Sequence, residues 1–382
     1  MRSVVRSIVL VVCALAALCS ITFDLVVPAP PSDTAVTSAQ PSKLSQNTVQ
    51  LIAATSATTK KATVRATEKQ TIAQTTLPPD PYAELGIPAQ ADQTVYTQQV
   101  KAFMLEQKLE YTAMQALLDS GRTFEQITSM THEERMIESF VFANPRPGGT
   151  PEDLLEVLPK QFAQLTVQYP LIVSREQYGS SVQGRSLDAY ILANCAQPER
   201  TIILTFAIHG YEGLKANDGV YLTESACRLI RFYCQNPTFL GTTQLIICPM
   251  LNPDGVFKPA ASGYGREQSQ GVDMNRDFRK DMFKAQESQA FRDFLLANKP
   301  EILIDFHGWL NGTYGDAQLA EVFRHHTGLE HTDPNYGSQM GYLMGYAYKQ
   351  GIRSLLVEHV HYNKIDLGGM IGAVNELCAD AA

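Results

Sequence analysis

The second half of the chain alternates short, continuously apolar segments with longer amphipathic ones. The apolar segments are residues 202–208 (IILTFAI), 245–248 (LIIC), 302–304 and 355–357. The amphipathic segments, with apolar side chains at helical spacing, are residues 218–235 and 285–298. Continuous apolar runs are typical of strands buried on both faces, and helices between such strands cover the faces of a parallel or mixed sheet. The pattern therefore predicts an α/β domain.

Helical periodicity also precedes this domain. Apolar residues recur at helical spacing in residues 92–119, which predicts one amphipathic helix, and residues 132–142 predict a shorter one. They form either a small accessory module or helices packed on the α/β domain, and we favour the second interpretation. The segment NPRPGG then breaks the chain before Thr150, an N-cap hydroxyl followed by proline and two acids. We place a helical accessory segment at residues 92–145 and the main domain at residues 150–382.

The first residues resemble an export signal. Arg2 and Arg6 precede an apolar run at residues 7–23, so residues 1–26 are predicted to be a signal peptide or a signal anchor. Residues 27–83 are rich in Thr, Ala, Ser and Pro, and we predict a disordered linker there. The protein is expected outside the cytoplasm, either secreted or anchored in the membrane and facing outward. Cleavage and anchoring both remain open.

Composition limits the partners and the metal ligands that this chain can use. The 382 residues carry a net charge of -8 without any basic block, so we expect no nucleic-acid partner. The seven cysteines are widely spaced and contain no CxxC pair, and Cys227 and Cys234 are expected to be buried on a helix. A metal site in this chain would therefore be built from histidines and carboxylates.

Polar groups suited to catalysis follow three of the predicted strands. His209 and Glu212 follow residues 202–208, His307 follows residues 302–304, and Glu358 follows residues 355–357. Ligands of open α/β sheets bind outside the carboxyl ends of strands. Two imidazoles and one carboxylate supply three of the four positions that zinc prefers, and the fourth stays open for water. Each group alone is a weak signal, but the set predicts a catalytic zinc site.

Six motifs in a fixed order resemble the zinc metallocarboxypeptidase family, the relatives of carboxypeptidase A. The resemblance extends from about Gly179 to the C-terminus through the motifs GSSVQGRSL, HGYE, LNPDG, GVDMNRDF, DFHG and LLVEH. It implies a mixed, mostly parallel eight-stranded sheet sandwiched between helices, with the first motif in a hairpin. It also implies one Zn²⁺ per chain.

The resemblance assigns roles to individual residues. His209, Glu212 and His307 match the zinc ligands, and Glu358 matches the general base that activates water and then protonates the leaving amine. The remaining matches concern substrate and transition state: Asn275 and Arg276 for the terminal carboxylate, Arg266 for the oxyanion, and Tyr336 for capping the substrate. The alternatives to Tyr336 are Tyr342, Tyr346 and Tyr348.

Other positions depart from the family or are excluded from the site. Tyr211 stands where pancreatic-type members carry a substrate-binding arginine. Residues 341–348 (GYLMGYAY) offer Leu343 and Met344 and no acid, so the resemblance implies an apolar specificity pocket without a preference for basic residues. The remaining histidines are expected to be surface, loop or supporting residues and not zinc ligands: His325, His326, His331, His359 and His361.

The leading functional hypothesis is a zinc carboxypeptidase, expected to be a monomer, that hydrolyses C-terminal bonds of peptides. A second hypothesis keeps the site but takes peptidoglycan stem peptides as substrate, including γ-D-glutamyl-diamino acid bonds. Two further alternatives are an aspartoacylase-like amidohydrolase and an inactive peptide-binding module. The intact LNPDG motif and the export signal argue against the amidohydrolase, and the presence of all ligands and Glu358 argues against the inactive module.

Overall fold

A computed structural model describes residues 80–212, 217–258, 265–279, 283–308, 310–333, 341–361 and 364–379. All of them belong to one compact unit, Thr76–Ala382. The expected signal segment (residues 1–26) and residues 27–79 of the expected linker lie outside the described residues. Among the helices of the described part, none has the length and apolar character needed to cross a membrane.

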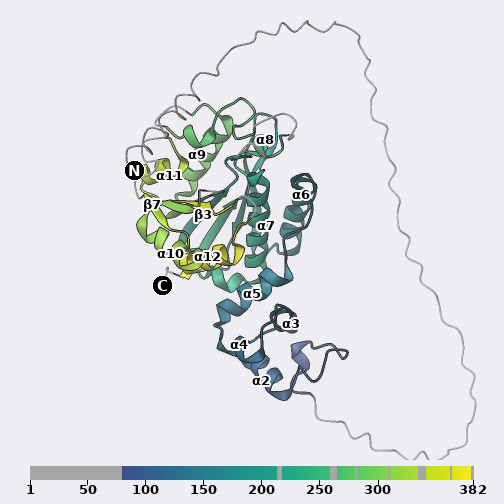
Figure 1. Cartoon of the computed structure of the whole chain (residues 1–382). Coiled ribbons are helices and arrows are strands. Elements are labelled where there is room, and N and C mark those ends of the chain that lie inside the picture. Colours follow the sequence, from purple (N-terminus) through teal and green to yellow (C-terminus); the bar gives the residue numbers. More distant parts are fainter. Residues whose placement is uncertain are drawn as a thin grey trace, which may run out of the picture. The chain divides into compact units, whose positions relative to one another are not determined.

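An eight-stranded mixed sheet forms the centre of the molecule (Figure 1), as predicted. Its order is β1-β2-β4-β3-β5-β8-β6-β7. The strands are β1 (Val173–Ser180), β2 (Ser186–Leu192), β3 (Arg200–Phe206), β4 (Thr243–Cys248), β5 (Ile302–Gly308), β6 (Gly312–Gly315), β7 (His331–Asp333) and β8 (Arg353–His359). The predicted hairpin is present, because β1 pairs with β2 in antiparallel fashion.

The four central strands are parallel. β3 pairs with β4 on one side and with β5 on the other, and β5 pairs with β8. The chain therefore leaves β3 toward one neighbour and returns on its other side, which creates a switch point at the carboxyl ends of β3 and β5. Crevices at such points are the usual ligand sites of open α/β sheets.

Both faces of the sheet are buried. Along β3, Ile202, Leu204 and Phe206 join one apolar core, whereas Ile203 joins a second core on the opposite face. The first core is covered by α6 (Pro151–Gln168), α7 (Asp218–Gln235), α10 (Ala317–Thr327) and α12 (Leu367–Ala379). The second is covered by α9 (Gln286–Asn298) and α11 (Leu343–Lys349). Burial on both faces explains why these strands lack alternation.

The N-terminal helices form a smaller cluster with its own apolar centre. Instead of the single helix predicted for residues 92–119, the structure has α2 (Gln98–Glu106) and α3 (Tyr111–Asp119). The prediction was wrong because Lys108 takes a left-handed φ of 52° and ends the first helix, so that Met104, Leu109 and Met114 pack together. The sequence pattern resembles one continuous helix because both helices bury apolar side chains at the same helical spacing.

Helix α5 joins this cluster to the main core. α4 (Phe124–Ser129) and α5 (His132–Ala143) follow α3, and Phe140 of α5 stacks edge-on against Phe232 of α7 in the main core. The remaining short helices are η1 (Ala83–Leu85), η2 (Pro237–Leu240), α8 (Pro253–Val256) and η4 (Met274–Arg276). Cys227 and Cys234 are buried on α7, as expected.

The predicted start of α6 is confirmed. The Thr150 hydroxyl accepts a hydrogen bond from the Asp153 N–H, and the Asp153 carboxylate accepts one from the Thr150 N–H, with Pro151 at the first helical position. This capping box satisfies two backbone donors that the helix itself leaves unpaired.

Replacing Thr150 with alanine is expected to lower the free energy of unfolding by about 1 kcal/mol, because one of these donors loses its acceptor. Urea denaturation followed by circular dichroism measures the change. Thr166→Ala on the same helix is the matched control, since its exposed hydroxyl bonds only the Ala163 carbonyl. Equal stability of Thr150→Ala and the wild type would contradict the capping role.

Candidate metal and active site

The first part of the site is the turn that follows β3. The strand ends at Phe206 and not at residue 208 as predicted, because Ala207 adopts a left-handed φ of 52°. The Leu251 N–H and the Asn252 N–H bond the carbonyls of Phe206 and Ala207, both at 3.0 Å. Such a conformation costs a non-glycine residue roughly 1–2 kcal/mol and persists where its surroundings enforce it. The turn carries His209 out of the strand.

Gly210 is required in this turn by close backbone packing. A Cβ at position 210 would lie 2.2 Å from the carbonyl carbon and oxygen of Gly255. The Asn252 amide also donates to the Ile208 carbonyl at 3.2 Å. The LNPDG motif is therefore the support against which the HGYE turn rests.

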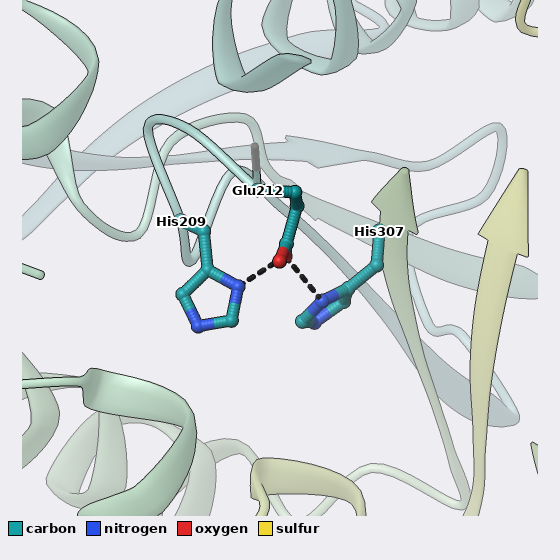
Figure 2. Close-up of side chains that lie close together, drawn as sticks. All are labelled: His209, Glu212 and His307. Carbon is teal, nitrogen blue, oxygen red and sulfur yellow. Dashed lines mark hydrogen bonds and ion pairs between the residues drawn. The ribbon is translucent and has the colours of Figure 1, made fainter. Parts of the chain in front are cut away.

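His209, Glu212 and His307 converge, as the sequence predicted (Figure 2). Each offers one ligand atom, and the three atoms lie within 4.8 Å of one another. The Nδ1 atoms of both histidines face Glu212 Oε1, at 3.3 Å for His307 and in direct contact for His209. Both imidazoles are 2% exposed. Two nitrogens and one carboxylate oxygen form a donor set that fits zinc and leaves a coordination position open.

Each histidine is oriented by a second carboxylate, which sequence analysis missed. Asp273 lies 2.9 Å from His209 Nε2, and Asp305 lies 2.9 Å from His307 Nε2. Thr205 in turn donates to Asp305 at 2.8 Å. Each of these carboxylates accepts a hydrogen bond from an Nε2–H group and leaves Nδ1 as the ligand atom, an arrangement common around protein-bound zinc.

Asp305 had a detectable signal in the sequence. It lies two residues before His307 on one strand, so both side chains point to the same face. Asp273 had no such local signal, because 64 residues separate it from His209.

The charges of this group support a cation at its centre. Burial disfavours the charged imidazole of His209, but Glu212 and Asp273 outweigh it and raise the pKa. Burial is likewise outweighed at His307, whose pKa Asp305 and Glu212 raise well above the usual value. The two histidines in turn hold the pKa of Glu212 well below its usual range despite burial. The two carboxylates facing each imidazole thus favour positive charge, which a divalent ion provides.

Glu358 lies beside this group on the neighbouring strand. It pairs in register with His307, and its Oε1 is 3.9 Å from His307 Nδ1. Its other oxygen, Oε2, is buried and has no hydrogen-bond partner among the described residues. Burial raises the pKa of Glu358 to about 7, with Glu212 adding to the shift and His307 opposing it. A carboxylate with such a pKa suits a group that first takes and then returns a proton near neutral pH.

Arg266 reaches the same group. Its guanidinium contacts Glu212 Oε2, and its Nε donates to Asp273 at 3.1 Å. Asp273 therefore bridges a predicted zinc ligand and the predicted oxyanion-stabilising arginine.

Asn275 and Arg276 follow on the short helix η4. The Asn275 side-chain oxygen accepts the Leu343 N–H at 3.1 Å, which ties η4 to the start of α11. Arg276 stacks over the Tyr342 ring at 4.1 Å, and its Nη1 donates to the Asn275 carbonyl at 2.8 Å. Both residues are thus held at the edge of the site by backbone and aromatic contacts.

Asp218 is a further residue that sequence analysis missed. It is fully buried at the first position of α7, and its two carboxylate oxygens lie 2.8 and 3.1 Å from the Glu212 N–H that donates to them. Burial and the nearby Glu212 raise its pKa to about 8. Asp218 fixes the backbone from which the Glu212 ligand projects.

The structure describes three of the four tyrosines considered as the cap over the substrate. Tyr336, the predicted cap, lies outside the described residues. Tyr342 is buried under Arg276, Tyr346 packs against Phe278, and Tyr348 is exposed. Tyr211 is buried, and its hydroxyl donates to the Lys258 carbonyl at 3.2 Å.

The predicted pocket residues Leu343 and Met344 are both buried. Leu343, the first residue of α11, packs in the apolar core that α9 also covers, whereas Met344 contacts Tyr314 and Leu356. An apolar specificity pocket stays a prediction.

The remaining histidines differ in part from expectation. His325 and His326 were predicted in loops but lie on α10, and His331 lies on β7, since apolar residues such as Phe323 anchor this segment to the core. His325 and His326 meet Glu376 at the surface in a second group whose spacing would admit a metal. Their rings are stacked nearly parallel, 11° apart, so one ion cannot lie in both ring planes without a rotation.

His359 is not a ligand in this geometry. It is buried and stacks on Phe306, and burial lowers its pKa to about 4. Its Nε2 has no hydrogen-bond partner among the described residues.

A mixed α/β sheet with a His-Glu-His group and an adjacent buried carboxylate defines a metallohydrolase-type site. Residues 160–354 match the sequence profile of the zinc carboxypeptidases, peptidase M14, and the chain belongs to this family. His209, Glu212 and His307 lie inside the matched segment, whereas Glu358 lies just beyond it.

Individual relatives are more distant. Bacteriocin BCN5 of Clostridium perfringens is 30% identical over 218 residues, which are 51% of this chain and 24% of that protein. The chain thus spans about a quarter of that curated relative. Among solved structures, bovine thrombin-activatable fibrinolysis inhibitor is 14% identical with a TM-score of 0.49, covering 59% of this chain and 96% of the other. A metallo-carboxypeptidase from Burkholderia cenocepacia is 19% identical with a TM-score of 0.46, covering 59% and 69%.

Replacing Asp305 with alanine is expected to weaken zinc binding about 10- to 100-fold, because His307 loses the acceptor that orients it. Competition with a chromogenic chelator measures the dissociation constant. Asp305→Asn keeps an acceptor oxygen and should be affected less. Asp293→Ala, at an exposed carboxylate on α9, is the control. Unchanged zinc affinity in a folded Asp305→Ala protein would rule out the orienting role.

Proposed function

We propose that this protein is an exported zinc carboxypeptidase that removes residues from the C-terminus of peptides. The observation that carries the proposal is the position of Glu358: its Oε1 lies beside the His209–Glu212–His307 group, and its buried Oε2 has no hydrogen-bond partner in the described part of the chain. A metal group alone fits a structural site, but a neighbouring carboxylate with a pKa of about 7 adds the proton carrier that hydrolysis needs.

The two histidines and Glu212 would hold a zinc ion, which would supply a Lewis acid able to polarise a carbonyl and to lower the pKa of water toward neutrality. Glu358 accepts the proton of the attacking water and delivers it to the amine that leaves. Arg266 stabilises the negative charge that develops on the carbonyl oxygen, since its guanidinium already reaches the metal-binding group.

The carboxylate specificity comes from η4. Arg276 is a planar guanidinium suited to bidentate contact with a carboxylate, and its stacking on Tyr342 fixes the plane of the fork. Asn275 supports it through the bond to Leu343. A peptide whose terminal carboxylate reaches Arg276 would present its last peptide bond to Glu358, which is the reason for proposing exopeptidase activity.

Export is part of the proposal and rests on the sequence of residues 1–26. Determining the N-terminus of the protein recovered from the medium and from the membrane fraction of an expressing bacterium tests it. Protein found exclusively in the cytoplasm with Met1 or Arg2 at its N-terminus would overturn this part.

Glu358→Gln is expected to lower kcat at least about a hundredfold without loss of zinc, because the proton carrier is removed while the ligands remain. Mass spectrometry of a mixed peptide library reports the loss of single C-terminal residues. Removing zinc with a chelator should abolish the same activity, and adding zinc should restore it. The control is Glu330→Gln, at an exposed carboxylate. Full activity in Glu358→Gln would exclude the proposed role.

A second candidate substrate is the stem peptide of peptidoglycan. It is favoured by the export predicted from residues 1–26, which would bring the enzyme to the cell wall, and it is compatible with the name of one relative, a bacteriocin. Purified stem peptides in the same assay separate the two: cleavage of stem peptides alone, lost in Glu358→Gln, favours the wall substrate, and cleavage of ordinary linear peptides favours the first candidate.

A further inference from the structure

A small cationic cavity adjoins the proposed carboxylate clamp. Its volume is about 280 Å³, and its lining includes Arg276, Arg279 and Lys284 together with Asp273 and Asp277. The same Asp273 contacts His209 Nε2, so the cavity borders the metal-binding group. A substrate that reaches Arg276 therefore brings its last side chain next to this cavity.

The two carboxylates of the lining are already engaged. Asp273 accepts contacts from His209 and Arg266, and its pKa is lowered, because these two groups and the neighbouring Arg276 outweigh its burial. Asp277 is buried, and its oxygens accept the backbone N–H groups of Lys284 and Ala285 at 2.9 to 3.0 Å. Neither acid is therefore in direct contact with the guanidinium of Arg279 or the ammonium of Lys284.

Arg279 and Lys284 are exposed at the cavity, and the structure gives them no ion pair within its described residues. The lining holds three cations, Arg276, Arg279 and Lys284, against two acids, so its balance is positive in a chain whose net charge is -8. A concave surface with an excess of one sign of charge concentrates ligands of the opposite sign.

Gly341 packs against the segment that carries Arg276 and Arg279. It has a φ of 80°, and a Cβ there would lie 2.6 Å from the Arg276 carbonyl oxygen and 2.6 Å from Arg279 Cγ. The Phe278 N–H donates to the Gly341 carbonyl at 3.0 Å. The backbone at Gly341 thus packs against both the Arg276 carbonyl and the stem of Arg279, which line the same cavity.

We infer that this cavity, and not the apolar pocket expected at residues 341–348, receives the last side chain and binds a second carboxylate of the substrate, so that the enzyme prefers peptides ending in an acidic residue. Arg276 takes the terminal carboxylate, and Arg279 and Lys284 take the carboxylate of the last side chain. The inference rests on the proposed carboxypeptidase activity and adds the substrate class to it. It also gives a physical reason to expect little cleavage after a C-terminal lysine or arginine, whose charge the cavity repels.

The test uses the zinc-loaded full chain and peptides that differ only in their last residue: Glu, Asp, Leu or Lys. We expect kcat/KM to be about tenfold higher for Glu than for Leu and lowest for Lys. Arg279→Ala and Lys284→Ala should each lower the value for Glu about two- to fivefold, the size of an exposed ion pair, and leave Leu unchanged. Added salt should reduce the preference for Glu.

Lys160→Ala, which removes an exposed charge from α6, is the matched control. The double variant Arg279→Glu, Lys284→Glu should reverse the order, so that Lys is cut better than Glu. Equal rates for Glu and Leu in the wild type, or equal loss for every peptide in the single variants, would overturn the inference.

Failure of the proposed carboxypeptidase activity can be distinguished from failure of the cavity assignment. If the zinc-loaded wild type cuts none of the four peptides, the carboxypeptidase proposal fails, and binding then tests the cavity by itself. Titration with N-acetylglutamate and N-acetylleucine should show tighter binding of the former, and this difference should disappear in the double variant. Equal binding of the two would overturn the cavity assignment as well.

Discussion

The structure depends on keeping a group of buried charges mutually satisfied at the edge of an apolar sheet. Isolated burial of such groups is costly, and it is tolerated when every charge has an opposite partner or a metal. Here His209 Nε2 is hydrogen-bonded to Asp273, and His307 Nε2 is hydrogen-bonded to Asp305. The Nδ1 atoms of both histidines converge on Glu212. The partners come from the loops and strands around β3 and β5, so the sheet must bring these segments together before any of the charges is stabilised.

The surrounding backbone is shaped by this requirement. Ala207 takes a left-handed conformation, Gly210 packs against Gly255, and Asp218 holds the Glu212 N–H from the start of α7. Each feature is unfavourable or neutral for folding alone, since it strains the chain or buries a carboxylate. Together they fix the direction of one ligand side chain. The strained residue Ala207 and the buried carboxylate of Asp218 therefore lie where the chemistry takes place, while the apolar cores on the two faces of the sheet supply the stability.

One loop links the metal-binding group to the residues proposed to bind substrate. Asp273 contacts His209 and Arg266, and the residues that follow it form η4, which carries Asn275 and Arg276. A single eight-residue motif thus orients a metal ligand, a residue proposed to stabilise the oxyanion and the proposed carboxylate clamp. A displacement of this loop would affect all three, which makes the motif the point where binding and catalysis are coupled.

The sequence by itself determined the α/β class, the positions of β4, α7 and α9, the Thr150 cap, and the identity of His209, Glu212 and His307. These follow from apolar periodicity, capping chemistry and residue order, which are local properties of a chain. Only the tertiary structure decided that Asp273 and Asp218 belong to the site, that two helices replace the single one predicted for residues 92–119, and that Arg279 and Lys284 share a cavity with Arg276. These features depend on contacts between segments or on backbone conformations such as those of Lys108 and Ala207, and no local pattern encodes them. The difference has one physical reason: side-chain type and spacing constrain which surface is buried, whereas packing alone determines which distant groups then meet.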